Sequence, residues 1–309
     1  MKTLKLSKLV LLLFAATALL LASCDKEKNT EVVDTKSLQS LSADEAEVQN
    51  VNEEASNDVD AVLAGGAGLK NGGMPCNVTV DTAQIIGDTL YVYLTYNGEN
   101  CNGTRIREGQ IVVKKKVGTF WGQEGAQVVV DFIDFKVTRV ATGKSVTLNG
   151  TKIFTNVTGG GLRLLGHLYT SIVHRETGFL EATINDSLTR TWNMALQKTY
   201  TGALGTLEVT LAGIGSADGY DNLAWWGTNR ANEQFYTSII EPVVHRQTCG
   251  FDPVSGKKFH NIPSDNKNAT ITFGYDANGN LVGEGDCPTH FRLDWVKGIN
   301  SGTLYLPLH

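Results

Sequence analysis

The chain has 309 residues and a formal net charge of −5, and the distribution of that charge says more than its total. Residues 1–24 carry +3, residues 25–60 carry −8, and residues 61–309 are neutral. A neutral main domain without a basic stripe argues against nucleic acid as a partner, because phosphate backbones are bound by clustered Lys and Arg. The length suits one or two domains.

Residues 1–23 have the features of a lipoprotein signal peptide. Three lysines precede an apolar run from Leu9 to Leu21, which is shorter than the ~20 residues that a membrane-spanning helix needs. Leu21-Ala22-Ser23-Cys24 then has the Leu-small-small-Cys form of a bacterial lipobox. We therefore expect cleavage before Cys24 and attachment of lipid, palmitate included, which would hold the mature chain on a lipid bilayer. The alternative is an ordinary secretory signal that ends by chance at a cysteine.

An acidic tether and one helix are predicted next. Residues 24–41 are polar and short of large apolar side chains, as expected of a disordered tether. Ser42-Ala43-Asp44-Glu45 has the form of a capping box, and the apolar residues after it recur at helical spacing. We predict a short helix over about 43–63, packed on the domain or extending the tether, and then a Gly-rich linker that ends at residue 75. The apolar residues of this helix are Val48, Val51, Ala55, Val59 and Val62.

From residue 76 to residue 309 the apolar pattern changes to a period of two. Segments rich in β-branched and aromatic residues alternate with turn signals such as Asn97-Gly98 and Asn149-Gly150. This pattern predicts an all-β antiparallel domain, as a sandwich, a barrel or an extended meander with repeated strand-turn units. It also allows two repeated subunits with a break near 200–220. The expected strand segments include 89–96, 111–113, 126–140, 146–157, 206–211, 235–244 and 269–275.

Lipidation of Cys24 would leave four cysteines for disulfides: Cys76, Cys101, Cys249 and Cys287. An even number in an oxidising compartment is typical of disulfide pairs, and four cysteines allow three pairings. The local pairing would close two loops, each contributing roughly 3–4 kcal/mol in the chain-entropy model. A metal site is the alternative interpretation, although no C-x-x-C occurs in the sequence.

Two sequence repeats suggest equivalent positions in a sheet. Tyr-Thr-Ser-Ile followed by Val-His-Arg occurs at 169–175 and, with an insertion, at 236–246, which places His174 and His245 in similar contexts. We interpret these histidines as one strand position used twice rather than as a metal or proton site. Gly-Thr also precedes a cation repeatedly. The favoured interpretation is solvated cross-strand pairs, and the alternative is a row of cations that grips a polyanion or glycan. The cations are Arg105, Lys152, Arg230 and, without the glycine, Arg190.

Trp225 and Trp226, with Tyr220 nearby, are the best candidates for ligand binding. Adjacent indoles on a strand point to opposite faces, so at most one of them packs inward. An exposed indole near Asp218 and Asp221 could stack on a sugar ring. The alternative is one core Trp beside another that is buried under a loop.

The sequence offers no catalytic or metal-binding constellation. It lacks the G-x-S-x-G and H-E-x-x-H motifs, and the loop Asp276–Asn280 lacks the downstream Glu of a calcium site. We therefore predict no catalytic residue, no cofactor and no metal. The favoured function is a non-enzymatic binding or structural role. A carbohydrate-binding module beside a glycan-uptake system is the alternative, and a glycan hydrolase with carboxylates brought together by the fold is the weaker one.

Five short motifs follow one another along the mature chain. They are G-T-R-x-R-x-G-x-I-x-V (103–113), V-x-F-x-x-F-x-V (130–137), G-T-K-x-F-T-N (150–156), T-R-T-W (189–192) and G-T-N-R with P-V-V-x-R-x-x-C (227–249). Their order resembles a family of uncharacterised Bacteroidetes lipoproteins, and the residues after Cys24, Asp-Lys-Glu-Lys, are similar to a surface-export signal. The resemblance implies an all-β lipoprotein of the outer membrane, exposed at the cell surface, without an assigned activity. The segment Asn97–Cys101 is less acidic than in that family, which argues against a cation site there.

Overall fold

A computed structural model describes residues 36–65, 75–229 and 231–308, and the chain from Thr35 onward forms one compact unit. The predicted signal peptide, Cys24, most of the predicted tether and linker, and Arg230 lie outside the described residues. None of the helices in these ranges is both long and apolar enough to cross a membrane.

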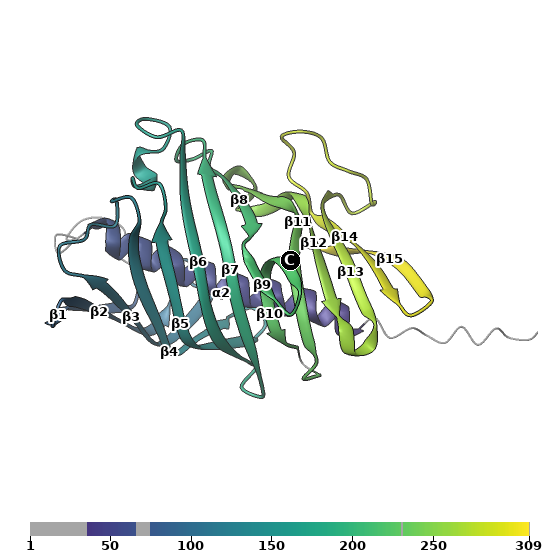
Figure 1. Ribbon diagram of the computed structural model, residues 1–309, viewed down its shortest axis with the longest axis horizontal. Helices are drawn as coiled ribbons and strands as arrows, with labels where there is room; N and C mark the ends of the chain where they lie inside the picture. Colours follow the sequence, from purple (N-terminus) through teal and green to yellow (C-terminus); the bar gives the residue numbers. More distant parts are fainter. Residues whose placement is uncertain (1–35, 66–74, 230, 309) are drawn as a thin grey trace, which may run out of the picture. The chain divides into compact units, whose positions relative to one another are not determined.

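One antiparallel sheet of fifteen strands and one long α-helix, α2 (Lys36–Gly65), account for most of the described residues (Figure 1). This confirms the predicted all-β class with an N-terminal helix. The sheet is a meander, because most strands pair with the next strand along the chain. The strands are β1 (Val78–Ile86), β2 (Thr89–Glu99), β3 (Arg105–Lys116), β4 (Ala126–Arg139), β5 (Ser145–Asn156), β6 (Ser171–Ile184), β7 (Leu188–Thr201), β8 (Glu208–Gly213), β9 (Gly215–Ala217), β10 (Tyr220–Thr228), β11 (Gln234–Arg246), β12 (Asp252–Ile262), β13 (Lys267–Tyr275), β14 (His290–Lys297) and β15 (Asn300–Pro307).

The helix is longer than the sequence predicts. It begins at Lys36, so residues 36–41 are helical rather than part of a tether. Leu38 and Leu41 are fully buried, and they extend the helical spacing of the apolar residues that follow. Only these two large apolar residues mark the first turns, which is why the composition of the segment favours a tether.

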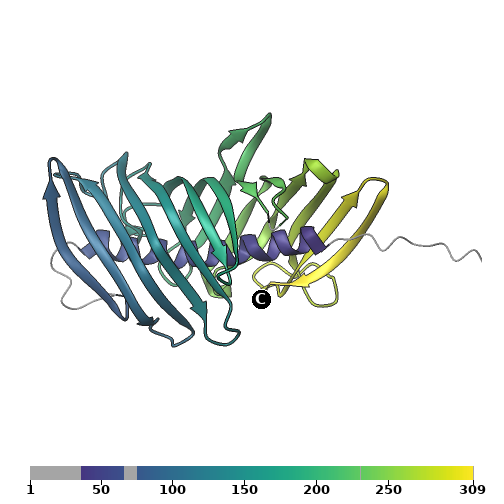
Figure 2. The ribbon, with the colours of Figure 1, turned by 90° about the horizontal axis from the view of Figure 1, so that it is seen from below.

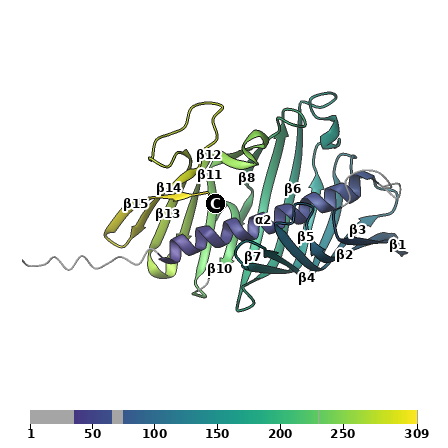
Figure 3. The ribbon, with the colours of Figure 1, turned by 180° about the vertical axis from the view of Figure 1, so that it is seen from behind.

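α2 runs across the strands on the concave face of the sheet (Figures 2 and 3). Its N-terminal part contacts β12 through Glu45 and Lys258, and its C-terminal part contacts β3 through Asp58 and Arg107. Its thirty residues span about 45 Å at 1.5 Å per residue. Neighbouring strands lie about 4.8 Å apart, so the helix is long enough to cross roughly nine of them.

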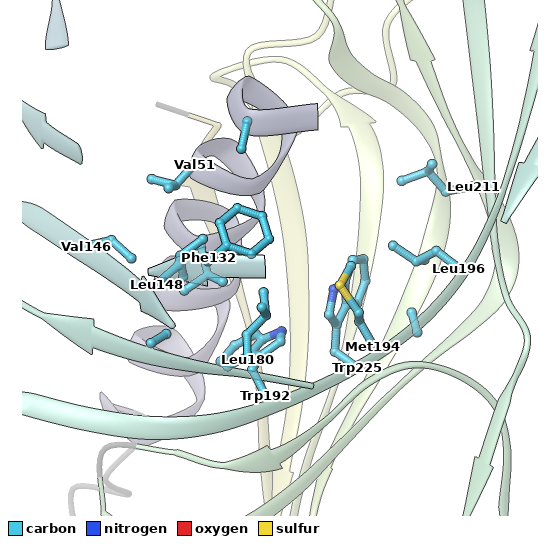
Figure 4. Packing of buried hydrophobic residues seen from close by; sticks show 14 of the residues in the cluster. Val51, Phe132, Val146, Leu148, Leu180, Trp192, Met194, Leu196, Leu211 and Trp225 are labelled. Atoms are coloured by element: carbon cyan, nitrogen blue, oxygen red, sulfur yellow. The ribbon is translucent and has the colours of Figure 1, made fainter. Parts of the chain in front are cut away.

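The main hydrophobic core lies between α2 and the concave face. Val51 of the helix belongs to the same buried cluster as Phe132 of β4 and Trp192 of β7. Figure 4 shows Met194 and Trp225 in this layer together with them. A single sheet therefore obtains its core from the helix instead of from a second sheet.

Glycines on the concave face allow the sheet to bend around the helix. At Gly150 in β5 (φ 125°) a Cβ atom would stand 2.4 Å from the carbonyl oxygen of Phe179. At Gly109 in β3 (φ 92°) it would stand 2.0 Å from that of Asp134. Because both positions lack a side chain, the neighbouring strands approach closely and the sheet can coil.

The sheet continues through residues 200–220, where the sequence allows a break between two subunits. β7 pairs with β6 on one side and with both β8 and β10 on the other, and β8 also pairs with β11. The chain thus adds the short strands β8 and β9 without starting a second domain. The Tyr-Thr-Ser-Ile repeat is not a structural repeat either, since its first copy begins before β6 and its second lies inside β11.

Two local disulfides are present. Cys76–Cys101 brackets the β1–β2 hairpin, with a sequence separation of 25 residues. Cys249–Cys287 joins the short 3-10 helix after β11 to the loop between β13 and β14, with a separation of 38 residues. Of the three pairings that four cysteines allow, the structure contains the local one.

Candidate functional site

A set of Lys and Arg side chains lies on the face of the sheet that packs against α2. Most of their ion-pair partners are Asp and Glu residues of this helix. We call this set the cation row. Its members lie on five strands, from β3 to β12, and their contacts run along the middle half of the helix, from Asp44 to Asp58. They are Arg105, Arg107, Arg139, Lys152, Arg190, Lys198 and Lys258.

At the centre of the row, Glu176 of β6 bridges two lysines. Its carboxylate lies 2.8 Å from Lys152 Nζ and 2.6 Å from Lys198 Nζ, and all three side chains are almost fully buried. Lys198 also contacts both carboxylate oxygens of Glu53 of the helix, at 2.5 and 2.7 Å. Lys152 donates to Asn52 Oδ1 at 2.5 Å. Burial alone would raise the pKa of Glu176, but the two ammonium groups outweigh burial and hold that pKa at about 2.

Near the N-terminal end of α2, two helix acids meet two cations of the sheet. Asp44 pairs with Arg190 of β7, and both side chains are buried. Glu45 lies 2.9 Å from Lys258 Nζ. The Lys258 ammonium also stands 4.5 Å from the centre of the Trp225 ring, a cation–π contact. Burial alone would raise the pKa of Glu45, but Lys258 and His260 hold that pKa below its ordinary value.

Toward the C-terminal end of α2, Asp58 and Arg107 form the main pair. Arg107 Nη1 donates to Asp58 Oδ2 at 2.8 Å, and Nη2 donates to the carbonyl oxygen of Cys76 at 2.7 Å. Tyr96 Oη donates to the same Asp58 oxygen at 3.0 Å. Glu54, one turn earlier, shares Arg107 at 3.5 Å. Burial raises the pKa of Asp58 to about 6, because Arg107 and Tyr96 only partly offset it and Glu54 adds a second negative charge.

These contacts correct the favoured interpretation of the Gly-Thr-cation repeat. Lys152 and Arg190 are fully buried on the concave face instead of forming solvated cross-strand pairs, and Arg105 pairs with Glu54. The alternative interpretation, a row of cations that grips a polyanion, describes the arrangement better. The polyanion is the helix of the same chain.

Trp225 and Trp226 point to opposite faces of the sheet. Trp225 is buried in the main core, 2% exposed, so it offers no surface to a ligand. Trp226 is half-buried on the other face, directly opposite Tyr236 of β11. Gly215 of β9 lies against the edge of the Trp226 ring, where a Cβ atom would come within 2.7 Å of Cζ3. Part of this indole therefore remains accessible.

Tyr220 belongs to the same outer patch. Its ring stacks on Tyr236 with the centroids 4.3 Å apart. Tyr236 Oη donates to Asp218 Oδ2 at 2.5 Å, and Asn261 Nδ2 donates to Tyr220 Oη at 2.8 Å. We call Tyr220, Trp226 and Tyr236 the outer aromatic patch, in which Tyr220 and Trp226 are half-buried and Tyr236 is buried, 7% exposed. It combines aromatic faces with hydrogen-bonding groups, which is the combination that sugar rings require.

His174 and His245 do not meet. They lie on β6 and β11, and β7 and β8 separate these strands in the sheet. The His174 ring packs between Trp121 and Tyr200, and His245 Nδ1 lies 2.8 Å from the carbonyl oxygen of Phe251. Burial lowers the pKa of each histidine to about 4, so both are neutral at pH 7.

The described residues contain no group of three or more His, Cys, Asp or Glu side chains that could hold a metal ion. His245 and His290 stand close in sequence to Cys249 and Cys287. Both sulfurs are nevertheless joined in a disulfide. A cysteine binds a metal ion as a thiolate, so neither sulfur can serve as a ligand in this state.

Sequence reasoning did not identify Glu176, Lys198 or Lys258, although a signal for them exists. In β6 the buried residues alternate along the strand, and Glu176 occupies a buried position between His174 and Leu180. A charge in register with core positions predicts a buried partner. The sequence does not say that the partners of Glu176 are Lys152 of β5 and Lys198 of β7.

No family model, curated protein or solved structure matches this chain. The arrangement of its own residues is therefore the guide to its function.

Proposed function

We propose that this chain is a lipid-anchored protein of the bacterial envelope that acts by presenting a surface, in a non-enzymatic binding or structural role. The observation that carries this proposal is that α2 covers the concave face of the sheet. The leader and the family resemblance support the location. The helix and the cation row support the non-enzymatic role.

The central carboxylate of the interface, Glu176, is sealed between helix and sheet. Its side chain is 3% exposed, and the two lysines that it bridges are 0% and 2% exposed. A general acid or base must come within hydrogen-bonding distance of its substrate. A carboxylate below a packed helix cannot do so while the helix stays in place, so its ionisation serves the fold.

Lipid at Cys24 would tether this unit through a short segment, because α2 begins at Lys36. Metabolic labelling with a palmitate analogue tests the anchor. The full chain should incorporate the label, and Cys24→Ala should abolish it. A matched control is Cys76→Ala/Cys101→Ala, which removes two other cysteines, joined in a disulfide, and should leave labelling intact. Label that persists after Cys24→Ala would contradict the anchor.

The outer aromatic patch favours carbohydrate as the ligand. Trp226 offers a partly accessible indole, and Tyr220, which is half-buried and stacks on the buried ring of Tyr236, extends the aromatic surface. Asp218 and Asn261 already bond the tyrosine hydroxyls, so they fix the orientation of the rings. A pyranose ring has an apolar face that can stack on such a surface and hydroxyls that can reach the polar rim.

A glycan array probed with the full chain tests this second candidate. Trp226→Ala should weaken binding about tenfold, which corresponds to the ~1.5 kcal/mol of a good ring contact. Phe120→Ala is a suitable control, because Phe120 is 70% exposed and lies in the β3–β4 connection. Trp225 is unsuitable for this test, since its removal would damage the core. Binding that survives Trp226→Ala would exclude the outer aromatic patch as the sugar site.

A further inference from the structure

Within the described residues the main path of the sheet is open, and it ends in two edge strands, apart from the short strand β9, which pairs only with β10. β1 pairs only with β2, and β15 pairs only with β14, within the described residues. Figure 1 places these strands at opposite ends of the sheet. An edge strand presents unpaired backbone N–H and C=O groups, which can template pairing with another strand.

The two edges differ in how well they are protected. β1 carries the charged residue Asp81, and its register with β2 shifts between Asp81 and Gln84. Charges and bulges of this kind discourage edge-to-edge pairing. β15 has no charged residue, and its register with β14 is unbroken over all eight positions. β15 is therefore the edge that is open to a partner strand.

The register of the β14–β15 hairpin identifies the free backbone groups of β15. Lys297 and Asn300 flank a two-residue turn, so they form a hydrogen-bonded pair, and such pairs alternate along an antiparallel ladder. Leu308 N–H donates to the carbonyl oxygen of Thr289, as expected if the hydrogen-bonded pairs alternate in this way. Ser301, Thr303 and Tyr305 therefore direct their backbone groups away from β14.

The apolar side of β15 is also incompletely covered. Leu304 and Leu306 are only half-buried where they pack at the margin of the main core. Phe291 and Trp295 of β14 are half-buried at the same margin. A further strand against β15 would remove more of this apolar surface from water, which is favourable.

We propose that β15 pairs antiparallel with β15 of a second copy of this chain, about a two-fold axis at Thr303. In this register Thr303 lies opposite Thr303 of the other copy, and Ser301 lies opposite Tyr305. Each of these outward-directed residues then exchanges both backbone hydrogen bonds with the residue opposite. Pro307, which has no N–H, falls outside these pairs.

A second copy is the favoured occupant because the edge is complementary to itself. Antiparallel pairing of a strand with its own copy is an isologous contact that closes as a dimer. β15 has no charges, so self-pairing brings no like charges together. Pairing of β15 with β1 would be heterologous, and the shifted register and Asp81 of β1 disfavour it.

Cysteine crosslinking in the full chain tests both the contact and its register. Thr303→Cys places two thiols across the axis with Cα atoms about 5.5 Å apart, which is within the range of a disulfide. Ser301→Cys is the matched control, because the two copies of that residue would lie roughly 13 Å apart along the strands. Ser301→Cys/Tyr305→Cys restores a close pair between copies. The cysteines of the β domain are already held in disulfides.

After mild oxidation, we expect a band of twice the chain mass from Thr303→Cys and from the double variant, but none from Ser301→Cys. Adding Thr303→Lys to the double variant should abolish its crosslink, because it places two positive charges at the axis. Equal crosslinking of Ser301→Cys and Thr303→Cys would indicate random collision and overturn the proposal. So would the absence of a Thr303→Cys product, or a product whose mass shows a different protein.

Discussion

Two carboxylates of the helix–sheet interface, Glu176 at its centre and Asp58 toward the C-terminal end of α2, lie beside cations, yet their pKa values shift in opposite directions. The pKa of Glu176 is lowered to about 2, and that of Asp58 is raised to about 6. Burial pushes both values upward, and burial is the largest contribution in each case. The difference must therefore come from the groups that oppose burial.

The number of cations per carboxylate accounts for the contrast. Glu176 has Lys152 and Lys198 within hydrogen-bonding distance. Among the described residues, Asp58 is paired with Arg107 alone. Glu54 also contacts that guanidinium, and its negative charge repels the charge of Asp58. One shared cation does not offset the cost of burying a carboxylate, whereas two do. Glu176 is thus firmly ionised, and Asp58 is poised to take up a proton.

The largest expected effect comes from removing the central charge. Glu176→Gln leaves Lys152 and Lys198 buried without the carboxylate that they share, so the free energy of unfolding should fall by about 3–5 kcal/mol. Urea denaturation at pH 7 measures this loss. Glu181→Gln on the same strand is the control, because its side chain is exposed and a change within about 0.5 kcal/mol is expected. Equal effects of the two variants would contradict the assignment.

The opposite pKa shifts also predict opposite responses to acid. The folded pKa of Glu176 lies below its ordinary value of 4.5, so its contribution to stability is present above pH 4.5 and is lost as the pH falls toward 2. The folded pKa of Asp58 lies above its ordinary value of 3.8. Its contribution is therefore full below pH 3.8 and is lost as the pH rises through 6.

Asp58→Asn should isolate the second response. The variant keeps a neutral side chain at every pH, so the stability difference between the wild type and the variant should change between pH 4 and pH 7. At pH 4 the free energy of unfolding of the wild type, relative to that of the variant, should be higher than at pH 7 by on the order of 2 kcal/mol. Urea denaturation over this pH range measures it. Asp186→Asn, at an exposed Asp that pairs with Lys136, should show no such change. A flat difference for Asp58→Asn would refute the raised pKa.

Much of the fold follows from local sequence, because strand alternation and Gly or Asn turns are local signals. Whether a β chain closes into a barrel or remains a meander depends on whether its first and last strands meet. That is a property of all fifteen strands together, and no segment encodes it. Concave-face glycines such as Gly150 supply the bend, but their effect depends on a carbonyl oxygen of the neighbouring strand.

The helix–sheet interface was beyond sequence reasoning for a similar reason. Lys152 and Asn52 are 100 residues apart in the chain, and Lys258 and Glu45 are 213 apart. Alternation could place Lys152 on the face of Leu148 and Phe154, but it could not name a partner so distant. The tryptophans show the same limit. Sequence places Trp225 and Trp226 on opposite faces, while only the packing of α2 decides which face is the core.

The smallest expected effect lies at the rim of the interface, where Glu47 of α2 pairs with Arg139 of β4. The two side chains are 27% and 35% exposed, so water screens the 2.9 Å contact. Glu47→Gln should lower the free energy of unfolding by no more than about 1 kcal/mol. The loss should shrink further in 1 M salt, where the screening length is about 3 Å. The loss from Glu176→Gln should persist in the same salt, because a buried pair is screened far less. Similar salt dependence for both variants would mean that the centre of the interface is as open to water as its rim.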